Sequence, residues 1–442
     1  MTRFKRGLDL NQGLLLPPSL RDWLPEDHLA WFIQDAVESL DMDALSDRYR
    51  MCGKGELPYD PRMMLRVLIY SYCTGTFSSR KIAAQLEDSV AFRVLAGNQM
   101  PGHRTICRFR ERHIDQFSEL FVQVVRLAVE AGMAKVGTLA IDGTKVKANA
   151  SKHKAMSYDR MQKEEERLKR EIRAIVQRAA DVDQEEDVEF GPDFRGDELP
   201  EELARRETRL KCIQEAKERL ECRKAEEARH ADEKRARKAK AEGREPPKKR
   251  PGGRKYPKGQ PKPKDQENFT DPDSRIMKDS KGYEQSFNAQ AAVESESQLI
   301  VATEVTNCAA DVEALVPMIE QASINLGQPV EQVLADAGYR SEENFAVLEA
   351  AGIDAYVSIG RESKKANKSD LPATTRMREK LATQQGRDHY RKRKHVVEPV
   401  FGWVKNVLGF RAFSLRGSPK VNGEWNLMCL ALNLRRMKVL WS

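Results

Sequence analysis

Residues 136–142 read VGTLAID, a short apolar run that ends in an acid, and this pattern predicts a β-strand closed by Asp142. A second run of the same kind, VLAD at residues 333–336, closes with Asp336. Within two residues of each acid stands a glycine, which lets a ligand approach the backbone. Because catalytic groups collect at the strand ends of α/β sheets, the two acids are candidates for one site. A single strand-end Asp is more often a cap or turn residue, so the pair needs a third partner.

Further apolar runs alternate with helical patterns around these acids. The predicted elements are a strand pair at 283–293 and 299–305, helices at about 310–325 and 341–351, and a strand at 353–359. Since strands alternate with helices and the last third is helical and basic, we expect an α/β core of mixed sheet type. Asp311 opens the helix at about 310–325 and is interpreted as an N-cap, not as a catalytic residue.

Residues 1–135 are predicted to be all-helical. The pattern predicts helices from Pro61 to about Gly75, from Ser78 or Ser79 onward, over 90–95, and from His103 to about Ala131. Short helices with a basic final element are typical of a helix-turn-helix DNA-binding domain, and an ordinary bundle with solvated arginines explains them equally well. On the first interpretation the DNA contacts include Arg80, Lys81, Arg104 and Arg108.

Residues 155–265 differ sharply in composition from their surroundings. Apolar residues recur every seven positions, at Met161, Leu168, Ile175 and Val182. A similar pattern returns after an acidic break at 181–200, which predicts two charged helices in a hairpin or coiled coil. Such helices either dimerise the protein or fold back on each other. Residues 246–264 are rich in Pro, Gly and Lys and are predicted to be extended or disordered.

The charge distribution favours nucleic acid as the partner. The chain has 442 residues and a formal net charge of +8, and residues 234–264 alone hold 14 Lys and Arg against two acids. No stretch approaches the roughly 20 apolar residues of a membrane span, and the N-terminus lacks the apolar region of a secretory signal. The seven cysteines are scattered without a CxxC pair, which indicates reduced intracellular thiols and argues against disulfides or a zinc site.

The third acid comes from the basic C-terminal third. Residues 390–405 read YRKRKHVVEPVFGWVK, in which Glu398 stands seven residues before Lys405. This segment resembles the Tyr-Arg-Glu-Lys signature of bacterial insertion-sequence DDE transposases. Pro399 makes Glu398 a predicted helix-start residue, or marks a kink there, because proline is poorly tolerated inside a helix.

The match to the signature has one departure. Tyr390 and Arg393 have the expected spacing, but Arg393 lies one residue further from Glu398 than the pattern requires. Lys394 stands at the expected distance instead, so the basic role falls to Arg393 or Lys394. Trp403 could stack on a flipped base, although an aromatic at this position is more often part of the core.

The resemblance runs over most of the chain. Similar to family segments are the part from YDP at 59–61 through RTICRFR at 104–110, IDGT at 141–144, NFTDPDSR at 268–275, ADAGY at 335–339 and GFR at 409–411. It implies an RNase H-like catalytic domain over 136–154 and 266–442. A charged helical insertion at 155–265 would interrupt this domain, and a helical, DNA-binding domain at 1–135 would precede it.

The resemblance also implies the chemistry. The implied catalytic and metal-binding residues are Asp142, Asp336 and Glu398. They would hold two divalent ions, Mg²⁺ or Mn²⁺, which activate water or a DNA 3′-hydroxyl and stabilise the leaving oxygen. The implied phosphate contacts are Tyr390, Arg393 or Lys394, and Lys405. The ordinary alternative for such a basic run is a solvated helix face.

Three functions fit this sequence. The first is a transposase that binds the terminal inverted repeats of an insertion sequence and performs metal-dependent cleavage and strand transfer. The second is a catalytically silent DNA-binding protein derived from a transposase, and the third is a metal-dependent nuclease of the same fold. All three acids are present, which favours an enzyme. We expect double-stranded DNA as the partner, a homo-oligomer on DNA, no membrane association and a cytoplasmic, nucleoid-associated location.

Overall fold

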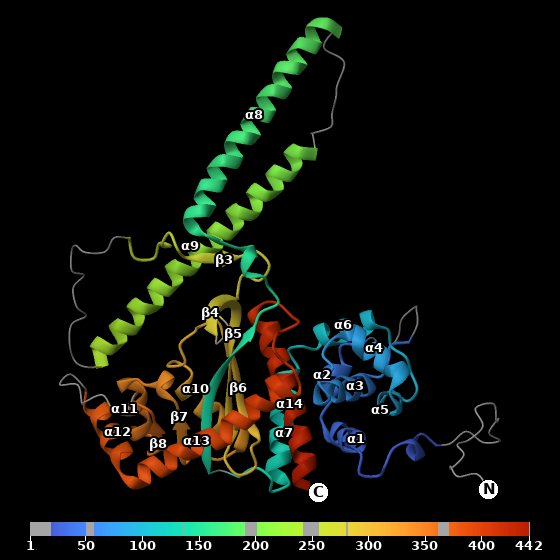
Figure 1. Ribbon diagram of the computed structural model, residues 1–442, viewed down its shortest axis with the longest axis vertical. Coiled ribbons are helices and arrows are strands. Elements are labelled where there is room, and N and C mark those ends of the chain that lie inside the picture. Colours follow the sequence, from blue (N-terminus) through green and yellow to red (C-terminus); the bar gives the residue numbers. More distant parts are fainter. Residues whose placement is uncertain are drawn as a thin grey trace, which may run out of the picture. The chain divides into compact units, whose positions relative to one another are not determined.

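The computed structural model in Figure 1 describes residues 19–49, 57–135, 137–190, 201–241, 256–279, 282–360 and 371–441. The chain divides into two compact units, the first of residues 1–146 and 288–442 and the second of residues 147–287. Most of the segment at 246–264, predicted to be extended or disordered, lies outside the described residues, as does the second half of the acidic break at 181–200. The predicted division into domains at 135, 155 and 265 stays a prediction.

A mixed sheet forms the centre of the first unit. Its strands are β1 (Thr138–Lys147), β5 (Gly282–Glu294), β6 (Ile300–Thr306), β7 (Gln332–Ala335) and β8 (Asp354–Val357). They lie in the order β6-β5-β1-β7-β8, with β5 and β6 antiparallel and β1, β7 and β8 parallel. A sixth strand, β4 (Arg275–Asp279), also pairs with β5 in antiparallel orientation. The fold is therefore α/β with a mixed sheet, in agreement with an RNase H-like core, and the prediction of fold class is confirmed.

The register between β1 and β7 sets the two predicted acids side by side. Ile141 pairs with Ala335 in parallel, so Asp142 and Asp336 come next at the same level. The prediction that Asp142 ends its strand is wrong, because β1 continues to Lys147. Val146 is buried beyond Asp142, and Ala148 after the strand still donates to the carbonyl of Gln285.

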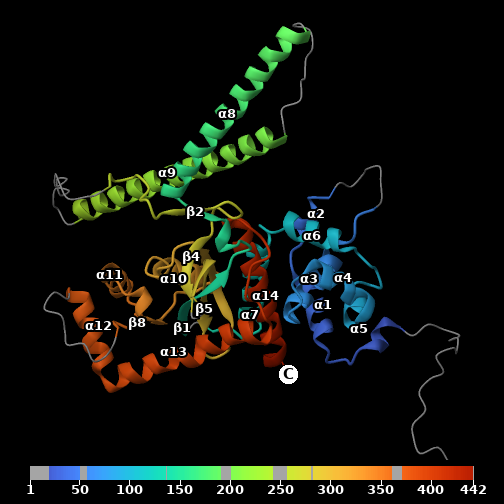
Figure 2. The same ribbon diagram turned by 45° about the horizontal axis from the view of Figure 1, so that its top comes forward.

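Helices from distant parts of the chain enclose this sheet (Figure 2). They are α7 (Phe117–Glu130), α10 (Leu315–Leu326), α11 (Glu342–Ala350), α12 (Pro372–Ala382), α13 (Gln384–Gly402) and α14 (Ser418–Trp441). Both α10 and α14 pack on β6, and α13 packs on β7 and β8. Nearly every residue of α14 between Val421 and Leu434 is buried, including Trp425, as expected for a helix that is covered on all sides.

The N-terminal helices share a core with α14. They are α1 (Leu29–Ser39), α2 (Asp43–Ser46), α3 (Pro61–Cys73), α4 (Ser79–Asp88), α5 (Val90–Leu95) and α6 (His103–Arg112). The fully buried Glu424 of α14 accepts a hydrogen bond from the Tyr72 hydroxyl of α3 at 3.2 Å and from the backbone N–H groups of Ser414 and Leu415. A buried charge is tolerated only with such partners, so this contact specifies how α3 meets α14.

Most of the predicted N-terminal helices are confirmed. Asp60 caps α3 by accepting from the backbone N–H of Arg62, with Pro61 at the first helical position. The single helix predicted from His103 to about Ala131 is wrong, because α6 ends at Arg112 and α7 begins at Phe117. Between them His113 is fully buried and bonds to the Tyr49 hydroxyl, so a tertiary contact prevails over helix continuation.

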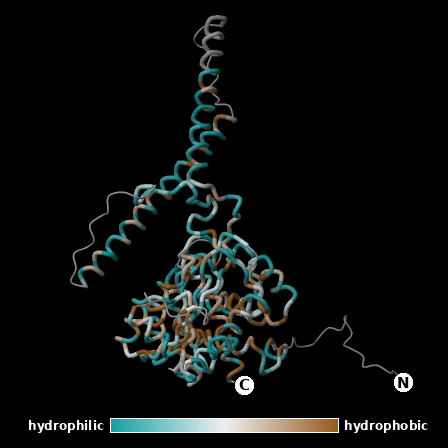
Figure 3. The backbone as a smooth tube through the Cα atoms, turned by 60° about the vertical axis from the view of Figure 1, so that its left-hand side comes forward, coloured by the Kyte–Doolittle hydropathy of each residue, from teal (hydrophilic) through white to brown (hydrophobic). Residues whose placement is uncertain are grey.

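The second unit is built on a helical hairpin, as predicted. Its elements are β2 (Ala155–Ser157), α8 (Tyr158–Phe190), α9 (Glu201–Ala241), β3 (Gln266–Asn268) and β4 (Arg275–Asp279). The two helices pack through a core of Met156, Met161, Leu168, Ile213 and Ala216. Further along α8 the seam is less covered, since Val176 is 50% exposed. Figure 3 shows hydrophilic residues along most of both helices.

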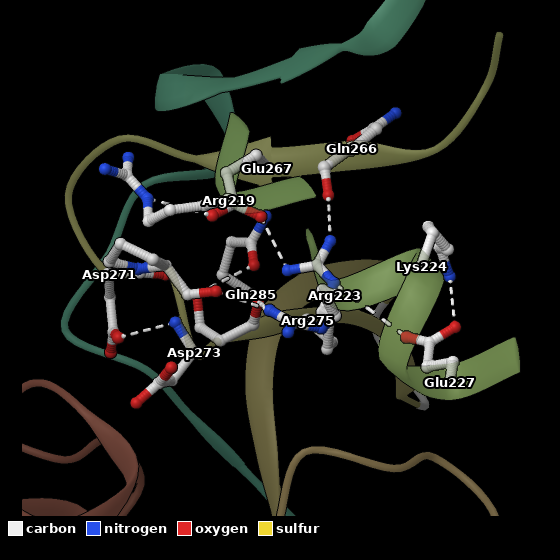
Figure 4. Close-up of polar contacts among 12 residues, drawn as sticks. Arg219, Arg223, Lys224, Glu227, Gln266, Glu267, Asp271, Asp273, Arg275 and Gln285 are labelled. Carbon is white, nitrogen blue, oxygen red and sulfur yellow. Dashed lines mark hydrogen bonds and ion pairs between the residues drawn. The ribbon is translucent and has the colours of Figure 1, made fainter. Parts of the chain in front are cut away.

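A buried ion-pair cluster joins α9 to β3 (Figure 4). The side chain of Glu267 is 1% exposed and pairs with Arg223 at 2.6 Å and with Arg219 at 3.4 Å. Arg223 also donates to the carbonyl of Gln266. Since a buried carboxylate needs such donors, this cluster fixes the register of α9 on the two-stranded sheet of β2 and β3. None of the helices in the described part of the chain has the length and apolarity to span a bilayer.

Candidate active site

Asp142 is the better anchored of the two sheet acids. Its Oδ1 accepts from the backbone N–H of Gly143 at 2.8 Å, and its Oδ2 forms a 2.8 Å ion pair with Arg393 of α13. Burial raises the pKa of Asp142, Arg393 opposes that rise, and the negative charge of Asp336 adds to it. The two carboxylates therefore interact electrostatically across the parallel strands, as their register leads us to expect.

Asp336 directly follows β7 and turns the chain into a short 3₁₀ segment, Ala337–Tyr339. Its Oδ1 accepts from the backbone N–H of Gly338 at 2.7 Å, and no described residue forms an ion pair with it. The prediction that this acid closes a strand is confirmed. One of its oxygens remains available to a ligand.

A third carboxylate, Asp311, lies beside this pair and was missed as a site residue. The prediction that it caps the following helix is wrong, because α10 begins at Leu315 with Ala314 at the N-cap. The side chain instead accepts from the amides of Asn288 at 2.6 Å and Gln290 at 2.7 Å. Asn288 and Gln290 are polar residues on one face of the buried stretch of β5, and this was the sequence signal that could have revealed the cluster.

The hydroxyl of Tyr339 interacts electrostatically with Asp142, Asp311 and Asp336. Its side chain is fully buried and its hydroxyl donates to Gln290 Oε1. Burial raises the pKa of the Tyr339 hydroxyl, and the negative charges of Asp311, Asp142 and Asp336 raise it further. All three carboxylates thus act on one buried hydroxyl.

The basic helix α13 contributes Arg393 to the acids. The Arg393 side chain is 10% exposed and points its guanidinium at Asp142, whereas Lys394 is exposed and Tyr390 is half-buried. Where the sequence left Arg393 and Lys394 as alternatives, the structure places only Arg393 at the acids. This pairing accounts for the burial of an arginine in a helix that is otherwise basic and solvated.

Glu398 forms no polar contact with the sheet acids. It is exposed on α13, and within the described residues it forms no hydrogen bond or ion pair with Asp142 or Asp336. Of the two alternatives predicted at Pro399, the helix start at Glu398 is wrong, because α13 runs through Pro399 to Gly402, and the kink stays a prediction. Across the described ranges, no three His, Cys, Asp or Glu side chains are grouped closely enough to hold a metal ion.

The helix changes its winding just after Pro399. Residues Trp403–Val407 form a π-helical turn, in which Lys405 donates to the carbonyl of Lys145 on β1 at 2.8 Å. Such turns are frequent at functional sites. Trp403 was expected in the core, but it is 40% exposed and lies under the guanidinium of Arg435 at 4.9 Å.

The four basic residues predicted to contact DNA from the N-terminal part are all exposed. Arg80 and Lys81 lie on α4, and Arg104 and Arg108 lie on α6, which packs against α4. The four side chains therefore point to solvent from two adjacent helices, where a polyanion can reach them.

The donor set at the sheet suits a hard divalent cation. Asp142 and Asp336 offer carboxylate oxygens on adjacent strands, and oxygen ligands are those that Mg²⁺ and Mn²⁺ prefer. Two segments of the chain also match known families, residues 18–112 a family described as "Transposase domain (DUF772)" and residues 253–434 one described as "Transposase DDE domain". The chain belongs to the DDE transposases. No curated protein and no solved structure matches it.

The two matched segments cover the parts that carry the predicted sites. The DUF772 segment contains α3 to α6 with their four exposed cations, and the DDE segment contains Asp336, Arg393 and Glu398. Asp142 lies between the two matches. Its place in this DDE transposase is therefore supported by the register of β1 on β7.

Proposed function

We propose that this DDE transposase binds the terminal inverted repeats of an insertion sequence and catalyses metal-dependent DNA cleavage and strand transfer. The observation that carries the proposal is the parallel register of β1 and β7, which sets Asp142 level with Asp336. Two carboxylates on adjacent strands form a rigid base for an in-line displacement at phosphorus.

Asp142, Asp336 and Glu398 are the proposed catalytic residues. Bound Mg²⁺ or Mn²⁺ would supply an activated nucleophile and charge stabilisation at the leaving oxygen. Glu398 is exposed, and we propose that it joins the pair through a change of α13 around Pro399. Proline leaves the helix one hydrogen bond short at that point, and the π-helical turn that follows is a second place where the winding can change.

Arg393 is proposed to bind two partners, one before and one after DNA arrives. Without DNA it neutralises Asp142, and with DNA its guanidinium takes a phosphate of the transposon end, which frees the carboxylate. Tyr390, Lys394 and Lys405 are proposed to contact the same DNA strand. We also propose that Arg80, Lys81, Arg104 and Arg108 bind the repeats, that the active form is a homo-oligomer on DNA, and that the protein acts on the nucleoid in the cytoplasm.

The proposal is tested by incubating the purified full chain with Mn²⁺ and labelled DNA that carries the inverted repeats flanking its gene. We expect cleavage at the repeat ends and joined products from the native protein and neither from Glu398→Gln. Cleavage without joining would identify a nuclease of this fold. Tight binding to the repeats without metal-dependent cleavage would overturn the proposal in favour of a catalytically silent DNA-binding protein.

A further inference from the structure

The turn that carries Asp336 is tied to a distant strand by a buried side chain. Asp336 precedes the 3₁₀ segment Ala337–Tyr339, and the hydroxyl of Tyr339 donates to Oε1 of Gln290 on β5. The side chains of Tyr339 and Gln290 are both 0% exposed. Because β1 lies between β5 and β7 in the sheet, this hydrogen bond joins the turn after β7 to a strand that is not its neighbour.

The amide of Gln290 is held in one orientation. Its Nε2 donates to Asp311 Oδ1 at 2.7 Å, and Asn288 Nδ2 donates to the same oxygen at 2.6 Å. The backbone carbonyl of Gln290 accepts from the indole N–H of Trp425 at 3.0 Å. Since Nε2 faces a carboxylate, Oε1 is the atom left for the Tyr339 hydroxyl, and it can only accept. Asp311 therefore sets which end of the amide meets Tyr339.

Gln290 also packs against the backbone beside Asp142. A Cβ on Gly143 would overlap Gln290 Nε2, so the amide lies directly on the bare backbone of this glycine. The backbone N–H of Gly143 in turn donates to Asp142 Oδ1 at 2.8 Å. One glutamine thus contacts both the residue that follows Asp142 and the tyrosine three positions after Asp336.

A second amide holds the backbone of the same turn. The buried Asn344 of α11 donates from Nδ2 to the carbonyl of Tyr339 at 2.9 Å and to the carbonyl of Val312 at 2.7 Å. The backbone of Tyr339 is therefore fixed independently of its hydroxyl. Removal of the hydroxyl alone should release the turn from β5 and leave the turn itself folded.

We propose that Gln290 is a positioning residue for the reaction at the sheet acids. Through Tyr339 it restrains the turn at Asp336, and through the backbone of Gly143 it restrains Asp142. Strand register places the two acids at the same level, and these contacts limit how far they can move apart during the reaction. Groups that act on one phosphate need a geometry held within about 0.5 Å by such supporting contacts. This inference rests on the proposed function.

The test compares Tyr339→Phe, Gln290→Leu and the double variant in the full chain. Each single variant leaves a buried polar group without its partner, so both should unfold more easily than the native chain. The double variant sets two apolar groups against each other and should regain most of the lost stability. It still lacks the directional bond, so kcat for metal-dependent cleavage of repeat DNA should stay about tenfold or more below native in all three, with KM within about twofold.

The matched control is Tyr356→Phe on β8, which removes the hydroxyl of another buried tyrosine, one that interacts with Asp354. It should leave kcat within about twofold of native. Native kcat in Tyr339→Phe would contradict the inference. So would a kcat that recovers together with stability in the double variant, because the hydrogen bond would then be structural only.

Hydrogen exchange of peptides that span residues 336–339 measures the mobility of the turn without DNA or metal. The N–H of Gly338 donates to Asp336 Oδ1, and it should exchange about tenfold faster in the double variant than in the native chain. Unchanged exchange would overturn the inference even if the native chain cuts no DNA. Faster exchange in the variant, together with a native chain that does not cut DNA, would contradict the proposed function alone.

Discussion

The acids on the sheet and the acid on α13 are held in different ways. Asp142 and Asp336 are level on paired strands, and each accepts a backbone N–H within two residues of itself. Glu398 is exposed on a helix that carries a proline and ends in a π-helical turn. Two of the three proposed catalytic acids are therefore placed by strand register alone. The last third lies on a helix that contains Pro399 and continues into a π-helical turn.

This difference suits an enzyme that must not cut DNA before the correct ends are bound. A site that is complete at all times would hydrolyse any DNA that reaches it. A site that gains its third carboxylate only on the bound substrate ties chemistry to recognition.

The largest effect is expected at the sheet. Asp142→Asn should slow metal-dependent cleavage on the order of 1,000-fold, about 4 kcal/mol in the barrier, because it removes a ligand from the rigid pair. Binding to repeat DNA should change by less than about twofold, since a carboxylate makes no attractive contact with phosphate. Cleavage rates and filter binding measure the two properties. Equal loss of both would show that Asp142 is structural.

The next effect is expected at the link between the two regions. Arg393→Gln leaves Asp142 half-buried without its cation and should destabilise the fold at pH 7 by about 2 kcal/mol. The pKa of Asp142, already raised by burial, should rise further, because the opposing charge is gone. A raised carboxyl pKa favours the protonated folded state, so the deficit should shrink as the pH falls toward that pKa.

Thermal unfolding at several pH values between 7 and the acid range checks this prediction. The matched control is Arg391→Gln on the same helix, whose side chain is 74% exposed. It should change stability by less than about 0.5 kcal/mol at every pH. A deficit for Arg393→Gln that grows at lower pH would show that its partner is not a carboxylate with a raised pKa.

A smaller effect on the stability of the fold is expected from alanine substitutions of one glycine in each region. Gly143→Ala directs a Cβ at the amides of Gln290 and Asn288 and at Asp311, and it should destabilise the fold by about 1–2 kcal/mol. Gly402→Ala on α13 meets nothing within 4 Å and should stabilise by up to about 1 kcal/mol, as expected for a helical glycine. Chemical denaturation measures both. The same sign for both variants would mean that the surroundings of Gly143 accommodate a methyl group.

The smallest effect is expected on the exposed face of α13. Lys394→Gln should weaken binding to repeat DNA about threefold and reduce the slope of log affinity against log salt by about one contact. Lys135→Gln, also exposed and paired with Glu296 at 3.6 Å, serves as the control and should leave both unchanged. An unaltered salt slope in Lys394→Gln would remove this lysine from the proposed DNA contacts.

The fold class and the sheet acids were predictable from the sequence because both depend on local pattern. Apolar runs such as VLA at residues 333–335 predict strands. The position of an acid that directly follows such a run is then set by the strand. The helical hairpin was predictable for the same reason, since its seven-residue spacing is local.

The parts that could not be predicted depend on tertiary contacts. Asp311 has the sequence context of a helix cap, and only the neighbouring strand β5 shows that its partners are Asn288 and Gln290. The break between α6 and α7 follows from the burial of His113 against Tyr49, which no local pattern encodes. Spacing likewise left Arg393 and Lys394 as alternatives, and the choice between them required the position of Asp142.

We propose that the sheet acids hold a cation before Glu398 joins them. It is tested most directly by measuring Mn²⁺ affinity of the native chain and of Glu398→Gln, each with and without repeat-end DNA. We predict equal affinities without DNA and a loss of about tenfold or more for Glu398→Gln with DNA bound. An equally large loss in the DNA-free state would contradict the account, because Glu398 would then belong to the site from the start.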